Sequence, residues 1–252
     1  EKKVYDNDIN DISSAGGWGS SADHAINEKF KFQLIAKLPA SDDCAYDYYD
    51  KYTVCFNDTL SDGITFDKLD TVEITNGDGG VSQVINNYTL DPNDPQSSFK
   101  LSIDNVKTCV PDLNKGATIT VTYTAHLNEN ATVNTEGGSN TTDNKNSVFL
   151  QYSNNPRIDT SLDQTPTSEV RVYTYQLNNT KYRDEVNENN KLEGAGFRLY
   201  SNEACTEEQE VKLYKKGNFY YPIKDATDKA QDAVEMFSDE HGQFNVKGLD
   251  AG

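Results

Sequence analysis

A lysine, an aspartate and an asparagine occupy positions from which they could react with one another. Residues two apart in a β-strand share a face, and by this alternation Lys2, Asp58 and Asn146 each stand at the end of an apolar face. The apolar residues that define the three faces are Val4, then Val54 and Phe56, then Val148, Leu150 and Tyr152. Burial lowers the pKa of a lysine and raises that of an aspartate. The three groups could then act as nucleophilic amine, proton-transferring acid and amide electrophile.

The residues alone leave a plainer interpretation open. Asn146 could simply begin a strand, Asp58 could form an Asx-turn, and Lys2 could be a solvated chain end. Lys3 has the opposite parity to Lys2, and Lys29 and Lys31 alternate with phenylalanines, so these three lysines are expected in solvent. A buried polar group is costly unless it is paired, so a reactive cluster requires that all three candidates meet in one core.

The elements that would hold these residues are short strands. Period-two alternation of apolar and polar residues recurs at 30–34, 52–56, 119–123, 148–152, 170–173 and 197–200, and turn sequences separate these runs. This spacing predicts an all-β protein built of β-sandwiches. Residues 226–237 are the one segment with a helical pattern, so we expect a short helix there.

The composition excludes several classes of protein. The net charge is −18, from 41 acidic and 23 basic residues, and a surface of this sign repels phosphate, so we expect no nucleic-acid partner. Hydrophobic residues make up only 35% of the chain, yet 15 tyrosines and 10 phenylalanines are present, whereas a disordered acidic chain lacks such aromatics. No window approaches the roughly 18 apolar residues of a membrane span, so we expect no membrane insertion.

The 252 residues are enough for two domains. The softest stretch is the polar segment 159–168, and the strand beyond it runs directly into a second unit, so we place the boundary near Tyr175. The expected units are residues 1–175 and 176–252. The second is short and stops in a turn-like sequence, so we expect a C-terminally incomplete sandwich.

Several segments resemble the backbone pilins that sortases polymerise on Gram-positive bacteria. The first unit resembles their collagen-adhesin A-type domain, and the second unit resembles their B-type domain. The segments that match the A-type domain are EKKV (1–4), FKFQL (30–34), FNDTLSDGITF (56–66), VTYTA (121–125) and NSVFLQYSNNP (146–156). Those that match the B-type domain are VYTY (172–175), LEGAGFRLY (192–200) and GQFNVKGL (242–249). Together they span nearly the whole chain in the family's order.

The resemblance implies tandem immunoglobulin-like sandwiches and an intramolecular Lys–Asn isopeptide bond in the first. It assigns Lys2 as nucleophile, Asn146 as electrophile and Asp58 as acid and base, in a single-turnover reaction of the chain on itself. Lys181 matches the isopeptide lysine of the B-type domain, although Asn179 stands where the pattern prefers an apolar residue. The pilin-motif lysine, the LPXTG sorting signal and the E-box glutamate are absent, so we expect this sequence to be the middle of a longer pilin.

The four cysteines show no CxxC or Cys/His spacing, so zinc and redox chemistry are not expected. No metal site is predicted. Alternating strand directions place the loops of Cys44 and Cys109 at the same end, which favours a Cys44–Cys109 disulfide. Cys44–Cys55 is the alternative pair, and an absence of any disulfide also stays open. In some relatives a cysteine at the place of Cys205 pairs with one near the E-box.

The function that we expect is that of a structural pilus subunit outside the cell, on the cell wall. Its partners would be other pilin subunits, joined covalently by sortase, and a host surface ligand is also open. The alternatives are a wall-anchored adhesin of similar domains and a wall glycosidase with a carboxylate pair. No cofactor is expected, and no enzymatic activity apart from the single-turnover reaction of the chain on itself.

Overall fold

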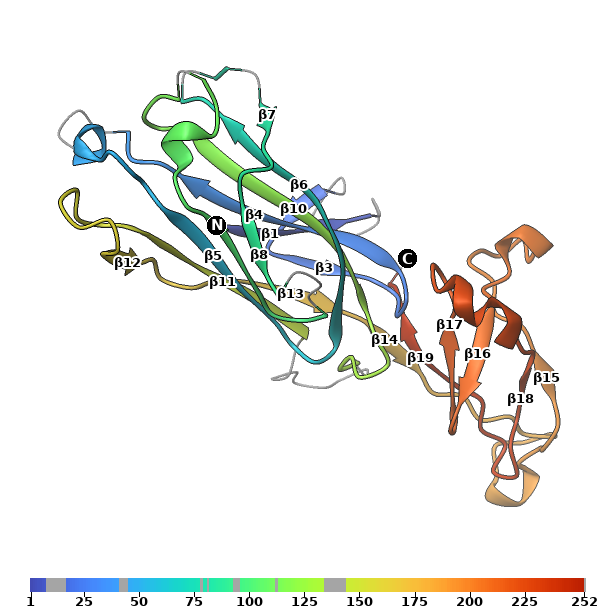
Figure 1. The fold of residues 1–252 in the computed structure, drawn as a ribbon. Helices are drawn as coiled ribbons and strands as arrows, with labels where there is room; N and C mark the ends of the chain where they lie inside the picture. Colours follow the sequence, from blue (N-terminus) through green and yellow to red (C-terminus); the bar gives the residue numbers. More distant parts are fainter. Residues whose placement is uncertain are drawn as a thin grey trace.

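The computed structural model describes residues 1–7, 17–40, 45–77, 79–80, 82–92, 96–111, 113–133 and 144–251. These residues form strands and short 3₁₀-helices, arranged as a large β-sandwich followed by a smaller β unit (Figure 1). The all-β prediction is therefore confirmed. Within the described ranges, no helix is both long enough and apolar enough to cross a bilayer.

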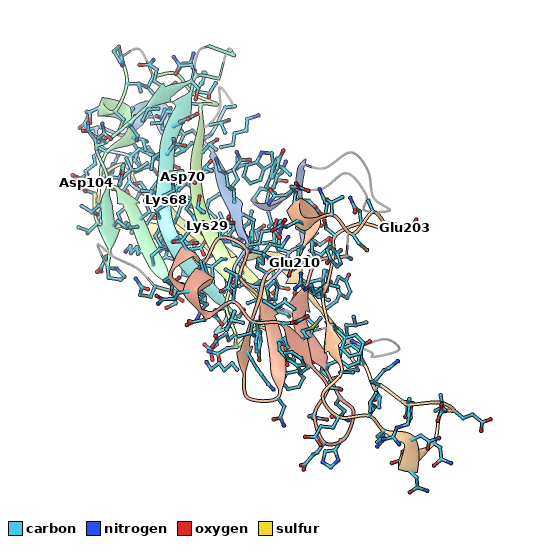
Figure 2. The ribbon with its side chains drawn as sticks, turned by 90° about the vertical axis from the view of Figure 1, so that its right-hand side faces the viewer. Lys29, Lys68, Asp70, Asp104, Glu203 and Glu210 are labelled. Carbon is cyan, nitrogen blue, oxygen red and sulfur yellow. The ribbon has the colours of Figure 1, made fainter. Side chains whose placement is uncertain are left out.

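The first sheet of the sandwich is antiparallel throughout and contains the N-terminal strand. Its strands, in spatial order, are β2 (Gly17–Gly19), β1 (Lys2–Asp6), β4 (Lys29–Lys37), β10 (Thr118–Leu127), β6 (Ile64–Thr75) and β7 (Gln83–Val84). The outer face of this sheet is polar: Lys29 extends from β4, and Lys68 forms an ion pair of 3.0 Å with Asp70 on β6 (Figure 2).

The second sheet contains the strands of the other two candidate residues. Its order is β3 (Ser21–Asp23), β13 (Ser168–Tyr173), β11 (Asn144–Ser153), β5 (Val54–Leu60), β9 (Phe99–Ile103) and β8 (Thr89–Asp91), and β12 (Leu162–Gln164) also pairs with β11. All of these pairs are antiparallel except β3 with β13. Four of the runs that we predicted as strands lie in β4, β10, β11 and β13, and the run 52–56 enters β5 at Val54. The strand predicted over 197–200 is wrong in extent, because only Phe197 belongs to a strand and Tyr200 makes an isolated bridge.

The core of the sandwich lies between the two sheets, because alternate residues of each strand point inward. On β4 and β10 these residues are Phe30, Phe32, Leu34, Ile119, Val121 and Tyr123, and on the opposite sheet they include Val54, Phe56, Leu101, Ile103, Val170 and Val172. The aromatic content of the chain thus fills a core that the low overall hydrophobicity would not suggest. Two 3₁₀-helices, η1 (Ala45–Tyr48) and η2 (Val106–Thr108), close one end.

The second unit is a four-stranded sheet with a separate strand pair. The sheet order is β14 (Tyr175–Leu177), β19 (Asn245–Leu249), β17 (Phe219–Pro222) and β16 (Leu213–Lys216), and the pair is β15 (Gly196–Phe197) with β18 (Met236–Phe237). Its small core consists of Leu213, Tyr220, Met236 and Val246. Three 3₁₀-helices, η3 (Glu188–Asn190), η4 (Glu207–Gln209) and η5 (Thr227–Asp232), connect the strands.

The helix that we predicted over residues 226–237 is wrong in type and in extent. The segment forms only the 3₁₀-helix η5 and then extends into β18. Met236 pairs with Phe197 of β15 and is buried in the small core. A pairing between residues this distant in the sequence overrides the local helical pattern.

The two units join without a spacer. β13 of the sandwich ends at Tyr173, and β14 of the second unit begins at Tyr175, so Thr174 is the single residue between these two strands. The Thr174 hydroxyl is buried and donates to Leu249 O at 3.0 Å. The Ile26 amide donates to Gly248 O at 3.0 Å, and three residues of the second unit, Tyr214, Tyr221 and Ile223, pack into the core of the first.

Candidate functional site

The structure brings Lys2, Asp58 and Asn146 together between the two sheets. Lys2 begins β1 in the first sheet, whereas Asp58 on β5 and Asn146 on β11 belong to neighbouring strands of the second. A fourth side chain, that of Tyr123 on β10, enters from the first sheet. The exposed fractions are 3% for Lys2, 2% for Asp58, and 0% for Tyr123 and Asn146. The site is therefore closed to bulk solvent.

The four side chains form one hydrogen-bonded cluster. Lys2 Nζ donates to Asp58 Oδ2 in an ion-pair contact and also to the Tyr123 hydroxyl at 3.2 Å. The Tyr123 hydroxyl donates to Asp58 Oδ1 at 3.2 Å and accepts a hydrogen bond from Asn146 Nδ2 at 2.5 Å. Asn146 Oδ1 is buried and has no hydrogen-bond partner among the described residues.

Burial shifts the protonation of the cluster towards its neutral forms. Desolvation lowers the pKa of Lys2 to about 8, against the opposing attraction of Asp58. Desolvation likewise raises the pKa of Asp58, although Lys2 and the Tyr123 hydroxyl oppose the change. The rings of Phe32 and Tyr123 lie 5.3 and 5.5 Å from Lys2 Nζ and supply much of this apolar surrounding. A neutral amine beside a neutral carboxylic acid is thus far more accessible here than in water.

Backbone pairing fixes the position of Lys2. The Glu1 amino group donates to Ile35 O at 2.8 Å, and the Ile35 amide donates back to Glu1 O at 2.8 Å. The Lys2 amide donates to Ser168 Oγ on β13 at 3.0 Å. This register turns Lys2 inward and Lys3 outward, where the Lys3 side chain is 32% exposed and lies 3.5 Å from Glu1 Oε1. The parity argument thus distinguished the two lysines as the structure does.

This arrangement provides the groups for an amide exchange. Lys2 offers an amine whose proton is held weakly, Asn146 offers a carboxamide, and Asp58 contacts the amine directly. Asp58 lies opposite Val148, two residues from Asn146 on β11, so the acid and the amide lie on adjacent strands. The Tyr123 hydroxyl contacts all three side chains.

Sequence reasoning missed Tyr123. The signal was present, because Tyr123 shares the inward face of β10 with Ile119 and Val121. A buried tyrosine hydroxyl needs a polar partner, and a core tyrosine on an inward face should have prompted a search for that partner. Which polar residue of the opposite sheet it would meet depends on how the two sheets stack.

The remaining predicted residues lie elsewhere. Lys181 of the second unit is half-buried, and its ammonium makes no ion pair within the described part of the chain. Cys44 lies outside the described residues, so both the Cys44–Cys109 disulfide and the alternative Cys44–Cys55 pair stay predictions. Cys55, Cys109 and Cys205 form no disulfide with one another. Lys107 Nζ donates to the carbonyls of Tyr46 and Tyr49 at 3.1 and 2.6 Å, so the segments next to Cys44 and Cys109 do lie at the same end.

Within the described residues, no group of three or more His, Cys, Asp or Glu side chains could hold a metal ion. The three histidines lie far apart in the chain: His24 is buried against Phe30, His126 contacts Asp67 at 2.9 Å, and His241 is exposed.

Comparison with known proteins gives similarity of fold. No family model matches the chain, and no curated protein matches it.

Solved structures do match the chain. The C-terminal 35 kDa fragment of the major pilin GBS80 of Streptococcus agalactiae is 19% identical at a TM-score of 0.61, over 99% of this chain and 80% of that one. Domains D2 and D3 of the major pilin SpaD from Corynebacterium diphtheriae are 20% identical at a TM-score of 0.58, over 100% of this chain and 74% of that one. The full-length major pilin RrgB from Streptococcus pneumoniae is 15% identical at a TM-score of 0.59, over 100% of this chain and 65% of that one. The chain therefore shares the β-sandwich fold of these major pilins along its whole length.

Proposed function

We propose that the chain is part of a structural subunit of a bacterial surface pilus, and that its first unit forms an isopeptide bond between Lys2 and Asn146. The observation that carries this proposal is the buried cluster, in which an amine, a carboxylic acid and a carboxamide from three strands meet without solvent. A buried ion pair is a costly way to gain stability, so a reaction that consumes the amine is the better explanation for its presence.

The reaction is an amide exchange in which all atoms balance. Neutral Lys2 Nζ attacks Asn146 Cγ, and a new C–N bond forms. Asp58, neutral beforehand, takes part in the proton transfers. The bond from Cγ to Nδ2 breaks, and Nδ2 leaves as ammonia after gaining one proton, which balances the proton that Lys2 loses. Asp58 ends in the protonation state in which it began.

The fold of the structural neighbours supports the pilus assignment. Each matches this chain over both of its units, and each is described as a major pilin. We assign the first unit to the A-type domain and the second to the B-type domain, with the boundary at the change of sheet around Thr174. Lys181 would be the isopeptide lysine of the second domain.

The same proposal sets partners and location. The subunit would be polymerised by sortase onto other copies, on the cell wall outside the cell, and it would be a structural protein whose only chemistry is on itself. A net charge of −18 suits a solvated extracellular shaft. A host ligand is compatible with this location.

The proposal is tested by mass spectrometry of the intact chain, with peptide mapping across residues 2 and 146. We expect the wild-type mass to be lower than the sequence mass by one ammonia, and a branched peptide to join Lys2 to Asn146. The variants Lys2→Met and Asn146→Ala should have their full sequence masses. Lys3→Met is the matched control and should still lose ammonia. A wild-type chain with its full sequence mass would overturn the proposal.

A further inference from the structure

The Tyr123 hydroxyl has its complete hydrogen-bonding capacity directed at the reactive cluster. A phenolic hydroxyl has one proton to donate and lone pairs that accept. Here the proton is directed to Asp58 Oδ1 at 3.2 Å, and the oxygen accepts from Lys2 Nζ at 3.2 Å and from Asn146 Nδ2 at 2.5 Å. No other described side chain forms hydrogen bonds with all three candidate residues.

Packing does not explain why this residue is a tyrosine. Its ring contacts those of Phe32, Phe66 and Phe99, each with a centroid separation of 5.3 Å. A phenylalanine would make the same ring contacts in this aromatic shell, and it would avoid the desolvation of a buried hydroxyl. The hydroxyl is therefore retained for what it contacts.

The two oxygens of Asp58 contact different partners. Oδ2 contacts Lys2 Nζ, and Oδ1 accepts from the Tyr123 hydroxyl. The nitrogen that must leave, Asn146 Nδ2, makes its hydrogen bond in the described structure to Tyr123 and none to Asp58. A proton that moves from Asp58 to the leaving nitrogen therefore has a direct path only through the tyrosine oxygen.

We infer that Tyr123 is a catalytic residue of the Lys2–Asn146 reaction and that its hydroxyl passes a proton from Asp58 to the departing nitrogen. This inference rests on the proposed function. As Lys2 Nζ bonds to Asn146 Cγ, its surplus proton moves to Asp58 Oδ2. Asp58 enters the step neutral, with its proton on Oδ1, so its hydrogen bond with Tyr123 runs from Oδ1 to the phenolic oxygen and the Tyr123 proton is free to turn to Nδ2. The hydroxyl gives that proton to Nδ2 and receives the Oδ1 proton. Nδ2 then leaves as ammonia, Tyr123 is restored, and Asp58 ends neutral with its proton on Oδ2. No other reactant is needed.

The surroundings of Tyr123 suit this role. Burial raises the pKa of Tyr123 well above its ordinary value, and the nearby Asp58 charge acts in the same direction. The hydroxyl therefore keeps its proton until the leaving nitrogen becomes basic in the tetrahedral intermediate, and it acts as a relay whose charge is only transient.

The test follows ammonia loss in full-length chain made by pulsed cell-free synthesis, using intact mass at timed intervals. We expect Tyr123→Phe to lose ammonia about 100-fold more slowly than the wild type, in the range typical of a lost acid–base group. Tyr46→Phe is the matched control, because Tyr46 is another buried core tyrosine, packed on Tyr52, and it should react at the wild-type rate. A Tyr123→Phe rate within about twofold of the wild type would overturn the inference.

A second comparison separates catalysis from folding. In the Asn146→Ala background no bond can form, so Tyr123→Phe there should change the melting temperature by only a few degrees. A double variant that fails to fold would show that the hydroxyl is structural and would also overturn the inference. If the wild type itself never loses ammonia, the proposed function fails; if the wild type reacts and Tyr123→Phe keeps pace with it, only the role of Tyr123 fails.

Discussion

Substituting methionine for Lys2 should lower the melting temperature of the chain by about 10–20 °C. Methionine has nearly the volume and flexibility of the lysine stem, so the aromatic surround of Phe32 and Tyr123 stays filled. The amine is lost, and Asp58 is left as a neutral acid that still contacts the Tyr123 hydroxyl. In the bonded wild type the lysine nitrogen is already an uncharged amide, so Lys2→Met removes no ion pair from it. The change therefore reports mainly on the missing covalent bond.

The magnitude follows from the positions of the two linked residues. A bond between Lys2 and Asn146 closes a loop of about 140 residues in the unfolded chain, and the chain-entropy estimate for a loop of this length is about 5 kcal/mol. For a chain of this size, 1 kcal/mol corresponds to about 2–4 °C in melting temperature. The product of these two figures gives the expected shift.

The assay is thermal unfolding followed by circular dichroism, on samples whose mass has first established whether the bond is present. Lys3→Met is the control, because Lys3 lies on the same strand with its side chain in solvent, and it should melt within about 2 °C of the wild type. The reasoning is refuted if the wild type carries the bond and Lys2→Met nevertheless melts at the same temperature.

Three further predictions concern the junction of the two units. Burial, with Glu28 and Asp23 nearby, raises the pKa of Asp250 to about 7; a raised acid pKa stabilises the fold below about pH 4 and loses that effect as the pH rises to about 7. In the wild type the free energy of unfolding in urea should therefore fall between about pH 4 and pH 7, and Asp250→Asn should remove about 1–2 kcal/mol of that fall. This figure allows for solvent screening of a half-exposed group. Gly248→Ala should cost about 2–3 kcal/mol in the same assay, because φ is +85° and the new Cβ would lie 2.5 Å from Ile26 Cδ1; an unchanged midpoint would contradict this. Glu129→Gln should cost about 1 kcal/mol, because Glu129 accepts from Tyr214 at 2.7 Å and from Lys216, and a loss no larger than that of an exposed Glu203→Gln control would argue against it.

The candidate site could be predicted to the extent that it depends on strand parity. Lys2, Asp58 and Asn146 each lie on an inward face because side chains alternate along a strand, and this alternation is a local property. Their meeting in one cluster is not local, since it needs β1 to face β5 and β11 across the core. The resemblance to pilins supplied that information, which composition and spacing lack.

Tyr123 and Met236 show where sequence reasoning ends. The inward direction of Tyr123 followed from its strand, but its partners depend on how the first sheet stacks on the second. Met236 lies in a segment whose apolar spacing favours a helix, yet it pairs with Phe197 in β15. In both cases the outcome is set by a contact between distant residues, which no local window contains.

The junction between the two units has a mechanical consequence, because Thr174 is the single residue between β13 and β14. A linker of many residues is an entropic spring, whose restoring force comes from the number of conformations that stretching removes. Thr174 provides no such reserve, because its hydroxyl is bonded to Leu249 O and Ile26 is bonded to Gly248 beside it. A chain of such units would therefore lengthen by straining hydrogen bonds at each junction, and its stiffness would be enthalpic in origin and only weakly dependent on temperature.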